Sequence, residues 1–194
     1  MKALILAAGR GERLRPLTDT TPKPLLPVGS HRLFDWQLTA LKKAGVTDVV
    51  INTAHLTAAF DTIPVELQKE GFRVSLSQEG TVAADALETL GGIAKALPLL
   101  TDGTEPFVVL AGDVVHAFDI KRLTVQKEAL IKGDKDAHLV VVPNPTFNLK
   151  GDLALGAEGE VIPGSGPYTY GCLMIASPRI FKGVSATRAK LFPW

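Results

Sequence analysis

Short, mostly apolar runs alternate along the chain with segments in which apolar residues recur every three or four positions. Apolar runs of this length are typical of strands that are covered on both faces in a parallel sheet. Strands are predicted for residues 3–7, 48–53, 72–77, 107–111, 138–143 and 168–176. The first run, Ala3 to Ala7, contains no polar residue, so it is expected to lie deep in the sheet.

Helical periodicity separates these strands. It predicts a helix over 33–44 with Gly45 as its C-terminal cap, helical residues from Thr57 that Pro64 interrupts, and helices over 87–99 and 120–131. This β-α-β alternation predicts an α/β fold with a Rossmann-like, doubly wound sheet and with ligand sites at the carboxyl ends of its strands. Residues 144–167 are rich in glycine and proline near their end and are expected to form an insertion of loose hairpins.

Composition narrows the possible partners. With 194 residues, of which 46% are hydrophobic, the chain can bury a full core as one domain. Its net charge of +1 provides too little positive electrostatic potential to bind nucleic acid. No apolar run reaches the length of a membrane span. Met1 to Ala8 is better interpreted as a first strand than as a signal peptide, because its apolar run is short. The single cysteine, Cys172, excludes an internal disulfide and fits a reducing cytoplasm.

The segment after the first strand carries candidate chemistry. Gly9 and Gly11 allow positive φ and a close approach of backbone N–H groups to an anion. Four cations and four prolines follow within a few residues: Arg10, Arg13, Arg15, Lys23, Pro16, Pro22, Pro24 and Pro27. Each arginine alone is more often a solvated surface charge, but prolines stiffen the loop that carries them. We therefore predict a phosphate-binding site here.

Two common phosphate-binding motifs do not match this segment. Leu14 stands where a dinucleotide fingerprint has its third glycine, and no Gly-Lys-Ser/Thr follows. Asp113 is a second candidate, since it follows an apolar strand and Gly112. A carboxylate at that edge of a sheet suits Mg²⁺, which needs few protein ligands beside substrate phosphates. An ordinary turn after the strand is the alternative interpretation of this pair.

The chain resembles the sugar-1-phosphate nucleotidylyltransferases from residue 1 to about residue 192. The matching motifs are LAAGRGERLRPLT from Leu6, PKPLLPV from Pro22, LETLGGIAKALPLL from Leu87, Gly112-Asp113, Asn144-Pro145 and Gly151-Asp152. It is most similar to the bacterial N-acetylmuramate-1-phosphate uridylyltransferases of cell-wall recycling. The resemblance implies a mixed sheet of the nucleotide-diphospho-sugar transferase type and transfer of a nucleotidyl group from a nucleoside triphosphate, UTP in that subfamily, to a sugar-1-phosphate.

The resemblance also implies roles for individual residues. Arg15 and Lys23 would be catalytic, and Asp113 would be a ligand of Mg²⁺. The nucleotide would contact residues of three motifs: Ala7, Ala8, Gly9, Gly11, Glu12, Arg13, Lys23, Glu88 and Gly91. The sugar would contact Asn144, Gly151 and Asp152. Related enzymes carry a second metal-binding aspartate in a later motif, so residues 1–194 are expected to form one nucleotidyltransferase domain that lacks its C-terminal segment.

Two alternatives stay open at this point. Another sugar and base, such as glucose-1-phosphate with UTP or mannose-1-phosphate with GTP, would leave the first motif unchanged. A non-catalytic module that binds sugar nucleotides would also carry most of these residues. The sequence does not indicate an oligomeric state.

Overall fold

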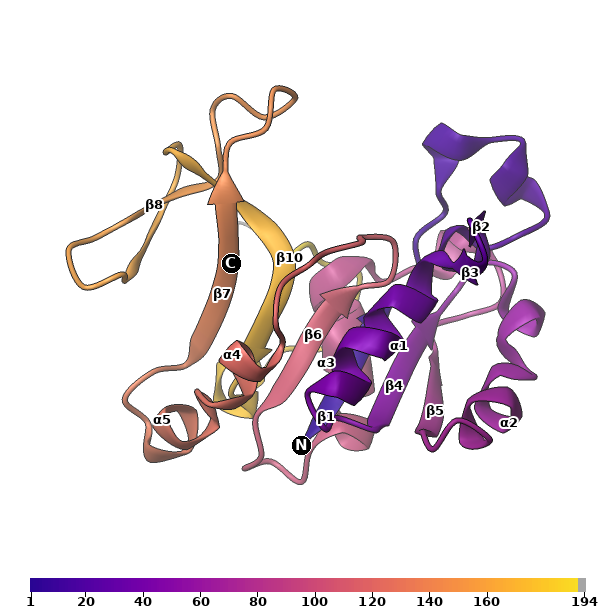
Figure 1. Ribbon diagram of the computed structural model, residues 1–194, viewed down its shortest axis with the longest axis horizontal. Helices are drawn as coiled ribbons and strands as arrows, with labels where there is room; N and C mark the ends of the chain where they lie inside the picture. The colour runs from indigo at the N-terminus through magenta and orange to yellow at the C-terminus, as the bar shows by residue number, and fades with distance from the viewer. Residues whose placement is uncertain (192–194) are drawn as a thin grey trace.

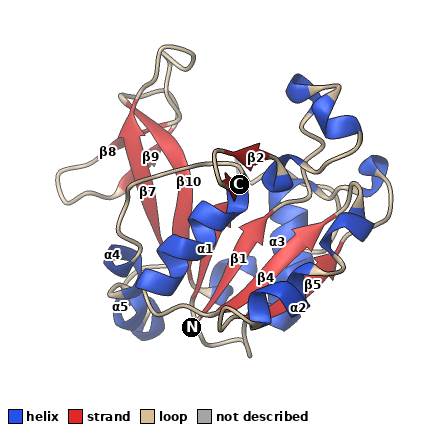
Figure 2. Ribbon diagram, turned by 45° about the vertical axis from the view of Figure 1, so that its right-hand side comes forward, coloured by secondary structure: helices blue, strands red, loops and turns tan. Residues whose placement is uncertain are grey.

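The computed structural model describes residues 1–191, which form a sheet of eight strands with helices on both faces (Figures 1 and 2). The strand order is β5-β4-β1-β6-β10-β8-β9, and β7 also pairs with β10. The strands are β1 (Lys2–Leu6), β4 (Asp48–Thr53), β5 (Arg73–Gln78), β6 (Phe107–Ala111), β7 (Ala137–Pro143), β8 (Leu153–Leu155), β9 (Val161–Pro163) and β10 (Tyr168–Ala176). A separate two-stranded ribbon joins β2 (Pro27–Val28) to β3 (His31–Arg32).

Strand β1 lies at the centre of the parallel half of the sheet. It pairs with β4 on one side and with β6 on the other, both in parallel. Ala3, Leu4 and Ile5 are fully buried, as expected for a strand covered on both faces. Strand β10 then pairs with β6 in the antiparallel sense, which makes the sheet mixed. The mixed, doubly wound sheet predicted from the sequence is confirmed.

The two faces of the sheet carry different helices. Helix α1 (Leu33–Lys43) packs Phe34 and Leu38 into the core that contains Ile5, while α3 (Glu88–Leu100) packs Ile93 into the core that contains Leu4. Successive residues of β1 thus enter opposite cores, because side chains of a strand alternate between its two faces. Gly45 follows α1 with φ +76°, in agreement with its predicted role as a cap.

Two predicted helical boundaries are wrong. Pro64 is the second residue of α2 (Ile63–Gln68) and does not interrupt it, since the N–H groups of the first helical turn have no partner within the helix. A short 3₁₀ turn, Thr57–Phe60, precedes it. The helix predicted over 120–131 is two short helices, α4 (Lys121–Thr124) and α5 (Lys127–Lys132). Val125 and Gln126 separate them, and Val125 is 70% exposed, so no burial of this side chain favours one continuous helix.

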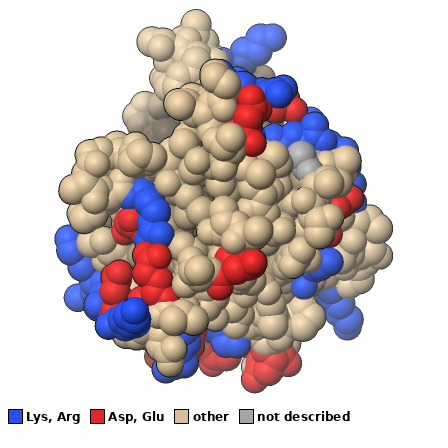
Figure 3. Space-filling model, turned by 90° about the vertical axis from the view of Figure 1, so that its right-hand side faces the viewer, with Lys and Arg blue, Asp and Glu red and all other residues tan. Residues whose placement is uncertain are grey.

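The predicted insertion contains a hairpin of β8 and β9, which extends the main sheet beside β10. This part of the molecule lies apart from the parallel half in Figure 1. On the face seen in Figure 3, acidic and basic side chains are interspersed, without one extended patch of either sign. No helix within residues 1–191 is long and apolar enough to cross a membrane.

Candidate active site

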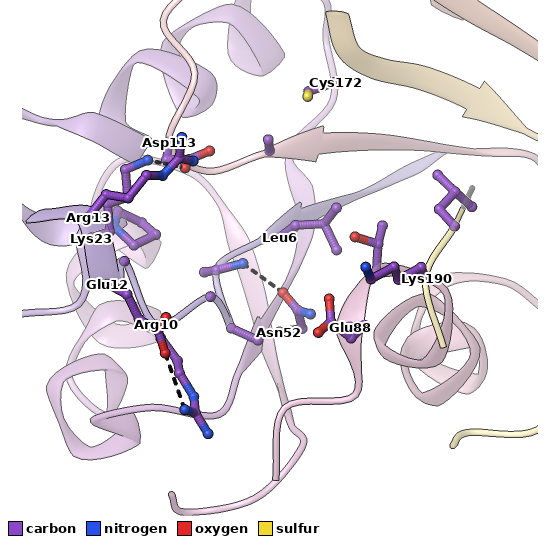
Figure 4. Close-up of a pocket in the computed structure, with 18 of the residues that line it drawn as sticks. Leu6, Arg10, Glu12, Arg13, Lys23, Asn52, Glu88, Asp113, Cys172 and Lys190 are labelled. Atoms are coloured by element: carbon purple, nitrogen blue, oxygen red, sulfur yellow. Dashed lines mark hydrogen bonds and ion pairs between the residues drawn. The ribbon is translucent and has the colours of Figure 1, made fainter. Parts of the chain in front are cut away.

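A cavity of about 810 Å³ opens at the carboxyl ends of β1 and β6 (Figure 4). Its walls come from parts of the chain that are far apart in sequence: the loop after β1, the start of α3, strand β10 and the segment 188–191. Of the predicted nucleotide-binding residues it includes Ala7, Ala8, Gly9, Gly11, Glu12, Arg13, Lys23 and Glu88, together with Asp113. The fold thus gathers most of the predicted site into one cavity.

The glycine loop, residues 9–13, begins directly where β1 ends. Gly11 adopts φ +64°, and its carbonyl accepts hydrogen bonds from the Leu14 amide (2.8 Å) and the Thr18 hydroxyl (3.0 Å). A Cβ atom at Gly11 would lie 2.7 Å from Thr18 Cγ2, so the loop can close only around glycine. Gly9 does not have positive φ, contrary to the expectation from sequence. A Cβ atom there would meet open space on the cavity side.

Lys23 and Asp113 form an ion pair in one wall of the cavity. Lys23 Nζ lies 2.5 Å from Asp113 Oδ2, and the two side chains are 25% and 35% exposed (Figure 4). Lys23 comes from a 3₁₀ turn, Lys23–Leu25, and Asp113 follows β6. An ammonium group that is paired with a carboxylate and partly exposed to a cavity can exchange that partner for the oxygen of an anionic ligand.

Arg15, the other predicted catalytic residue, is not brought into the cavity. Its side chain is 66% exposed, and its guanidinium forms an ion pair with Asp19 at 2.6 Å, four residues further along the chain. Asp19 thus provides a local partner that pattern reasoning did not consider. Arg13 of the same loop does line the cavity.

The position of Asp113 is fixed by buried hydrogen bonds. The Gly112 amide donates to the Leu6 carbonyl at 2.9 Å, and a Cβ atom at Gly112 would lie 2.9 Å from that same oxygen. The side chain of Gln37, fully buried on α1, donates to the carbonyls of Ala111 (3.0 Å) and Val114 on either side of Asp113. His116 Nε2 lies 2.8 Å from Gln37 Oε1, and burial lowers the pKa of that imidazole.

The start of α3 forms a further wall through Glu88 and Thr89. Gly91, predicted to contact the nucleotide, lies behind this wall. A Cβ atom there would lie 2.0 Å from the carbonyl oxygen of Thr187, so Gly91 allows the segment 187–191 to pack against the helix. The Ala189 carbonyl accepts hydrogen bonds from the amides of Leu90 (3.0 Å) and Gly91 (3.3 Å), which lie in the first turn of α3.

The cavity also contains residues that sequence reasoning did not select. Those from distant parts of the chain are Asn52, Tyr170, Cys172, Arg188, Lys190 and Leu191. Arg188 forms an ion pair with Glu88 at 3.3 Å. Burial raises the pKa of the Cys172 thiol, and Asp113 and Asp152 raise it further. No local motif marks these residues, because only the packing of β4, β10 and the segment 187–191 around the glycine loop brings them together.

The predicted sugar-binding residues form one polar cluster beside the cavity, but they do not line it. Asn144 Nδ2 donates to the Gly166 carbonyl at 2.7 Å, and a Cβ atom at Gly151 would clash with that oxygen and with the Asn144 amide. Asp152 Oδ2 accepts a hydrogen bond from the amide of Tyr170 at 2.9 Å, and Tyr170 reaches the cavity. The cluster thus supports the strand that forms this wall.

A divalent cation would have few protein ligands in this cavity. Within residues 1–191, no three histidine, cysteine, aspartate or glutamate side chains lie close enough together to hold a metal ion. Asp113 presents hard carboxylate oxygens beside the glycine loop, and these suit Mg²⁺ when substrate phosphates supply other ligands. The described residues therefore fit a magnesium ion that is shared with a substrate.

A glycine loop at the end of a central parallel strand, a lysine-aspartate pair and a cavity wall from the start of α3 are typical of enzymes that bind phosphorylated ligands. The chain belongs to the nucleotidyl transferase family, whose sequence model matches residues 2–148. It is 44% identical over 197 aligned residues to the N-acetylmuramate alpha-1-phosphate uridylyltransferase of Neisseria meningitidis serogroup B, and the alignment covers all of this chain and 83% of that protein. The family expected from the sequence is confirmed.

More distant relatives share part of the chain. A mannose-1-phosphate guanyltransferase of Xenopus laevis, beta-B, is 42% identical over 119 residues, which cover 61% of this chain and 32% of that protein. The chain thus spans about a third of the length of that relative. The crystal structure of a UDP-glucose pyrophosphorylase complexed with UDP-glucose has the same fold, with a TM-score of 0.71 at 20% identity over 93% of this chain and 77% of that one.

Proposed function

We propose that this protein transfers a uridylyl group from UTP to N-acetylmuramate-1-phosphate and releases pyrophosphate. The observation that carries the choice of substrates is the 44% identity to a uridylyltransferase of that specificity over the whole chain. The cavity supports the reaction class, because it combines a glycine loop, Lys23 and Asp113 in one wall. Such an enzyme would recycle a cell-wall sugar in the cytoplasm, where its single free cysteine is stable as a thiol.

The reaction joins two polyanions, so its main barrier is electrostatic. An oxygen of the sugar phosphate must attack the α-phosphorus of the triphosphate while pyrophosphate leaves. Backbone N–H groups of the glycine loop would bind the triphosphate oxygens, and Lys23 would stabilise charge on the transferring and leaving groups. Arg13 would add a second positive charge at the same wall. No covalent protein nucleophile is required, because positioning for in-line attack lowers the barrier.

Asp113 would hold Mg²⁺ together with substrate oxygens. When bound, the ion supplies positive charge that polarises the phosphoryl oxygens. In the structure Lys23 occupies Asp113 Oδ2, so a bound nucleotide would draw the ammonium group toward its phosphates and leave the carboxylate to the cation. Arg15 would contribute only through the loop that carries it, because Asp19 holds its guanidinium outside the cavity.

Glu88 and the first turn of α3 would form the nucleobase side of the site, opposite the glycine loop. The sugar would approach from β10, where Asn144, Gly151 and Asp152 hold the strand in place from behind. These assignments predict that truncating the cluster raises KM for the sugar phosphate more than KM for the nucleotide.

The direct test is pyrophosphate release measured over a grid of nucleoside triphosphates and sugar-1-phosphates in the presence of Mg²⁺. Turnover is expected to be fastest with UTP and N-acetylmuramate-1-phosphate. Faster turnover with GTP and mannose-1-phosphate or with UTP and glucose-1-phosphate would replace the substrates while keeping the reaction class. Tight nucleotide binding without turnover of any pair would contradict the enzymatic assignment.

A further inference from the structure

A chain of three hydrogen bonds connects Ala7, which precedes the glycine loop, to Leu87, which precedes α3. The amide of Ala7, at the end of β1, donates to Asn52 Oδ1 at 2.7 Å. Asn52 Nδ2 donates to Glu79 Oε1 at 2.6 Å, and Glu79 Oε2 accepts from the amide of Leu87 at 2.7 Å. Ala7, Asn52 and Glu88 line the cavity, so this chain begins at one wall and ends at Leu87, the residue directly before the other wall (Figure 4).

Asn52 and Glu79 are polar side chains buried in the interior, where such groups are costly. Asn52 is 2% exposed and Glu79 is 8% exposed, and within residues 1–191 the Glu79 carboxylate forms no ion pair. Burying a carboxylate without a cation is costly unless hydrogen bonds compensate. Burial raises the pKa of Glu79, and the bonds from Leu87 and Asn52 oppose that change.

The backbone around the pair leaves space for it. A Cβ atom at Gly92 of α3 would lie 2.4 Å from Glu79 Oε1 and 2.8 Å from Asn52 Nδ2. The helix can therefore approach the pair only with glycine at this position. The Glu79 amide itself donates to the Thr53 carbonyl at 2.7 Å, which ties the residue to β4, the strand of Asn52.

We propose that Asn52 and Glu79 are positioning residues that hold the glycine loop and the first turn of α3 at a fixed separation for a bound nucleotide. The inference rests on the proposed function, in which the glycine loop binds the phosphates and the first turn of α3 binds the nucleobase. A nucleoside triphosphate must contact both walls at once, so its affinity depends on their spacing. An inorganic triphosphate needs only the glycine loop.

The direction of the hydrogen bonds makes the pair testable. Ala7 and Leu87 both donate inward, so Asn52 must accept and then donate, and Glu79 must accept at both oxygens. Glu79→Gln places one N–H group against another, and Asn52→Asp places two carboxylates together. In the double variant Asn52→Asp with Glu79→Gln, the aspartate accepts from Ala7 and from the new amide, whose oxygen accepts from Leu87. Every donor again has an acceptor.

The experiment measures Kd for UTP and for inorganic triphosphate by calorimetry in the wild-type chain and the three variants. Each single variant is expected to weaken UTP binding by about tenfold or more, and the double variant to return within about threefold of wild type. Binding of inorganic triphosphate is expected to change by less than about threefold in Glu79→Gln, because this ligand uses one wall only. Asn52→Asp is expected to weaken it as well, since the new carboxylate lies beside the phosphate wall. Ser177→Ala, which removes a buried hydroxyl that caps a distant 3₁₀ turn, is the control for general destabilisation and is expected to bind UTP as wild type does.

Two results would overturn the inference while the wild-type chain binds UTP. One is a Glu79→Gln variant that binds UTP as tightly as wild type, and the other is an equal loss of affinity for UTP and inorganic triphosphate in Glu79→Gln. If a single variant does not fold, the double variant provides the test. A double variant that folds and binds UTP supports the positioning role of Asn52 and Glu79, and one that does not fold or does not bind UTP contradicts it. A wild-type chain that binds no nucleotide would instead refute the proposed function itself.

Discussion

At the scale of single residues, Lys23 tests the proposed stabilisation of charge on the transferring phosphoryl group. Replacing it with alanine should lower kcat by about a hundredfold, as the loss of a charge contact of about 3 kcal/mol in the transition state would do. Steady-state kinetics with saturating substrates would measure the effect. Lys43→Ala, an exposed lysine on α1, should leave kcat unchanged. An unaltered kcat in Lys23→Ala would remove Lys23 from the mechanism.

A substitution at Asp113 tests whether this carboxylate is a ligand of Mg²⁺. Asn has nearly the same volume as Asp but lacks the charge that a hard cation prefers, so Asp113→Asn should abolish Mg²⁺-dependent turnover while the protein stays folded. Activity against Mg²⁺ concentration, with thermal unfolding as the check on folding, gives the readout. Asp61→Asn, on the exposed surface near α2, serves as the matched change of charge. Equal metal dependence in Asp113→Asn and wild type would exclude this carboxylate as a ligand.

Valine substitutions at Gly9 and Gly11 distinguish steric blocking of the nucleotide from strain in the backbone of the loop. Gly9 has open space around its missing Cβ and no positive φ, so Gly9→Val should fold normally and weaken UTP binding by about tenfold or more by filling the cavity. Gly11→Val meets Thr18 at 2.7 Å and needs φ +64°, so it should lower the melting temperature as well. Measuring Kd and melting temperature for both variants distinguishes the two effects. Unchanged affinity in Gly9→Val would place the phosphates elsewhere.

At the scale of elements, the cavity depends on the packing of the segment 187–191 against α3. Gly91→Ala would push a methyl group into the Thr187 carbonyl and separate the segment from the helix. The amides of Leu90 and Gly91 would lose their acceptor on Ala189, so hydrogen exchange in the first turn of α3 should become faster. Leu99→Ala, on the exposed side of the same helix, is the control and should not change exchange there. Protection of Leu90 equal to that of wild type would show that this contact does not hold the helix start.

At the scale of the whole molecule, two histidines give stability a defined pH dependence. Burial lowers the pKa of His116 and of His138 below the ordinary value of 6.5, and Lys135 and Arg122 add to the effect at His138. Between pH 6.5 and these lower values, the unfolded chain binds protons that the folded chain does not, so the free energy of unfolding falls as the pH decreases. Denaturant titrations at pH 7.5 and 5.5 should show this loss, and His138→Gln should reduce it. An identical loss in that variant would contradict the assignment to His138.

The sequence by itself determined the main strands and helices, and it located the glycine loop and Asp113 after two buried strands. Residues 3–7, 107–111 and the glycine loop are local patterns, in which burial and turn chemistry act between neighbours in sequence. The β-α-β alternation predicts that both loops lie at the carboxyl edge of one sheet, but the ion pair of Lys23 and Asp113 also requires that β1 and β6 be adjacent.

Only the tertiary structure decided which polar groups share the cavity and which pair elsewhere. Arg15 and Lys23 look alike in the sequence, but Asp19 holds one outside and Asp113 holds the other inside. Asn52 and Glu79 stand 27 residues apart, and their hydrogen bond exists because β4 and β5 are adjacent in the sheet. Contacts of this kind depend on packing between distant segments, and a residue's neighbours in sequence carry no information about them.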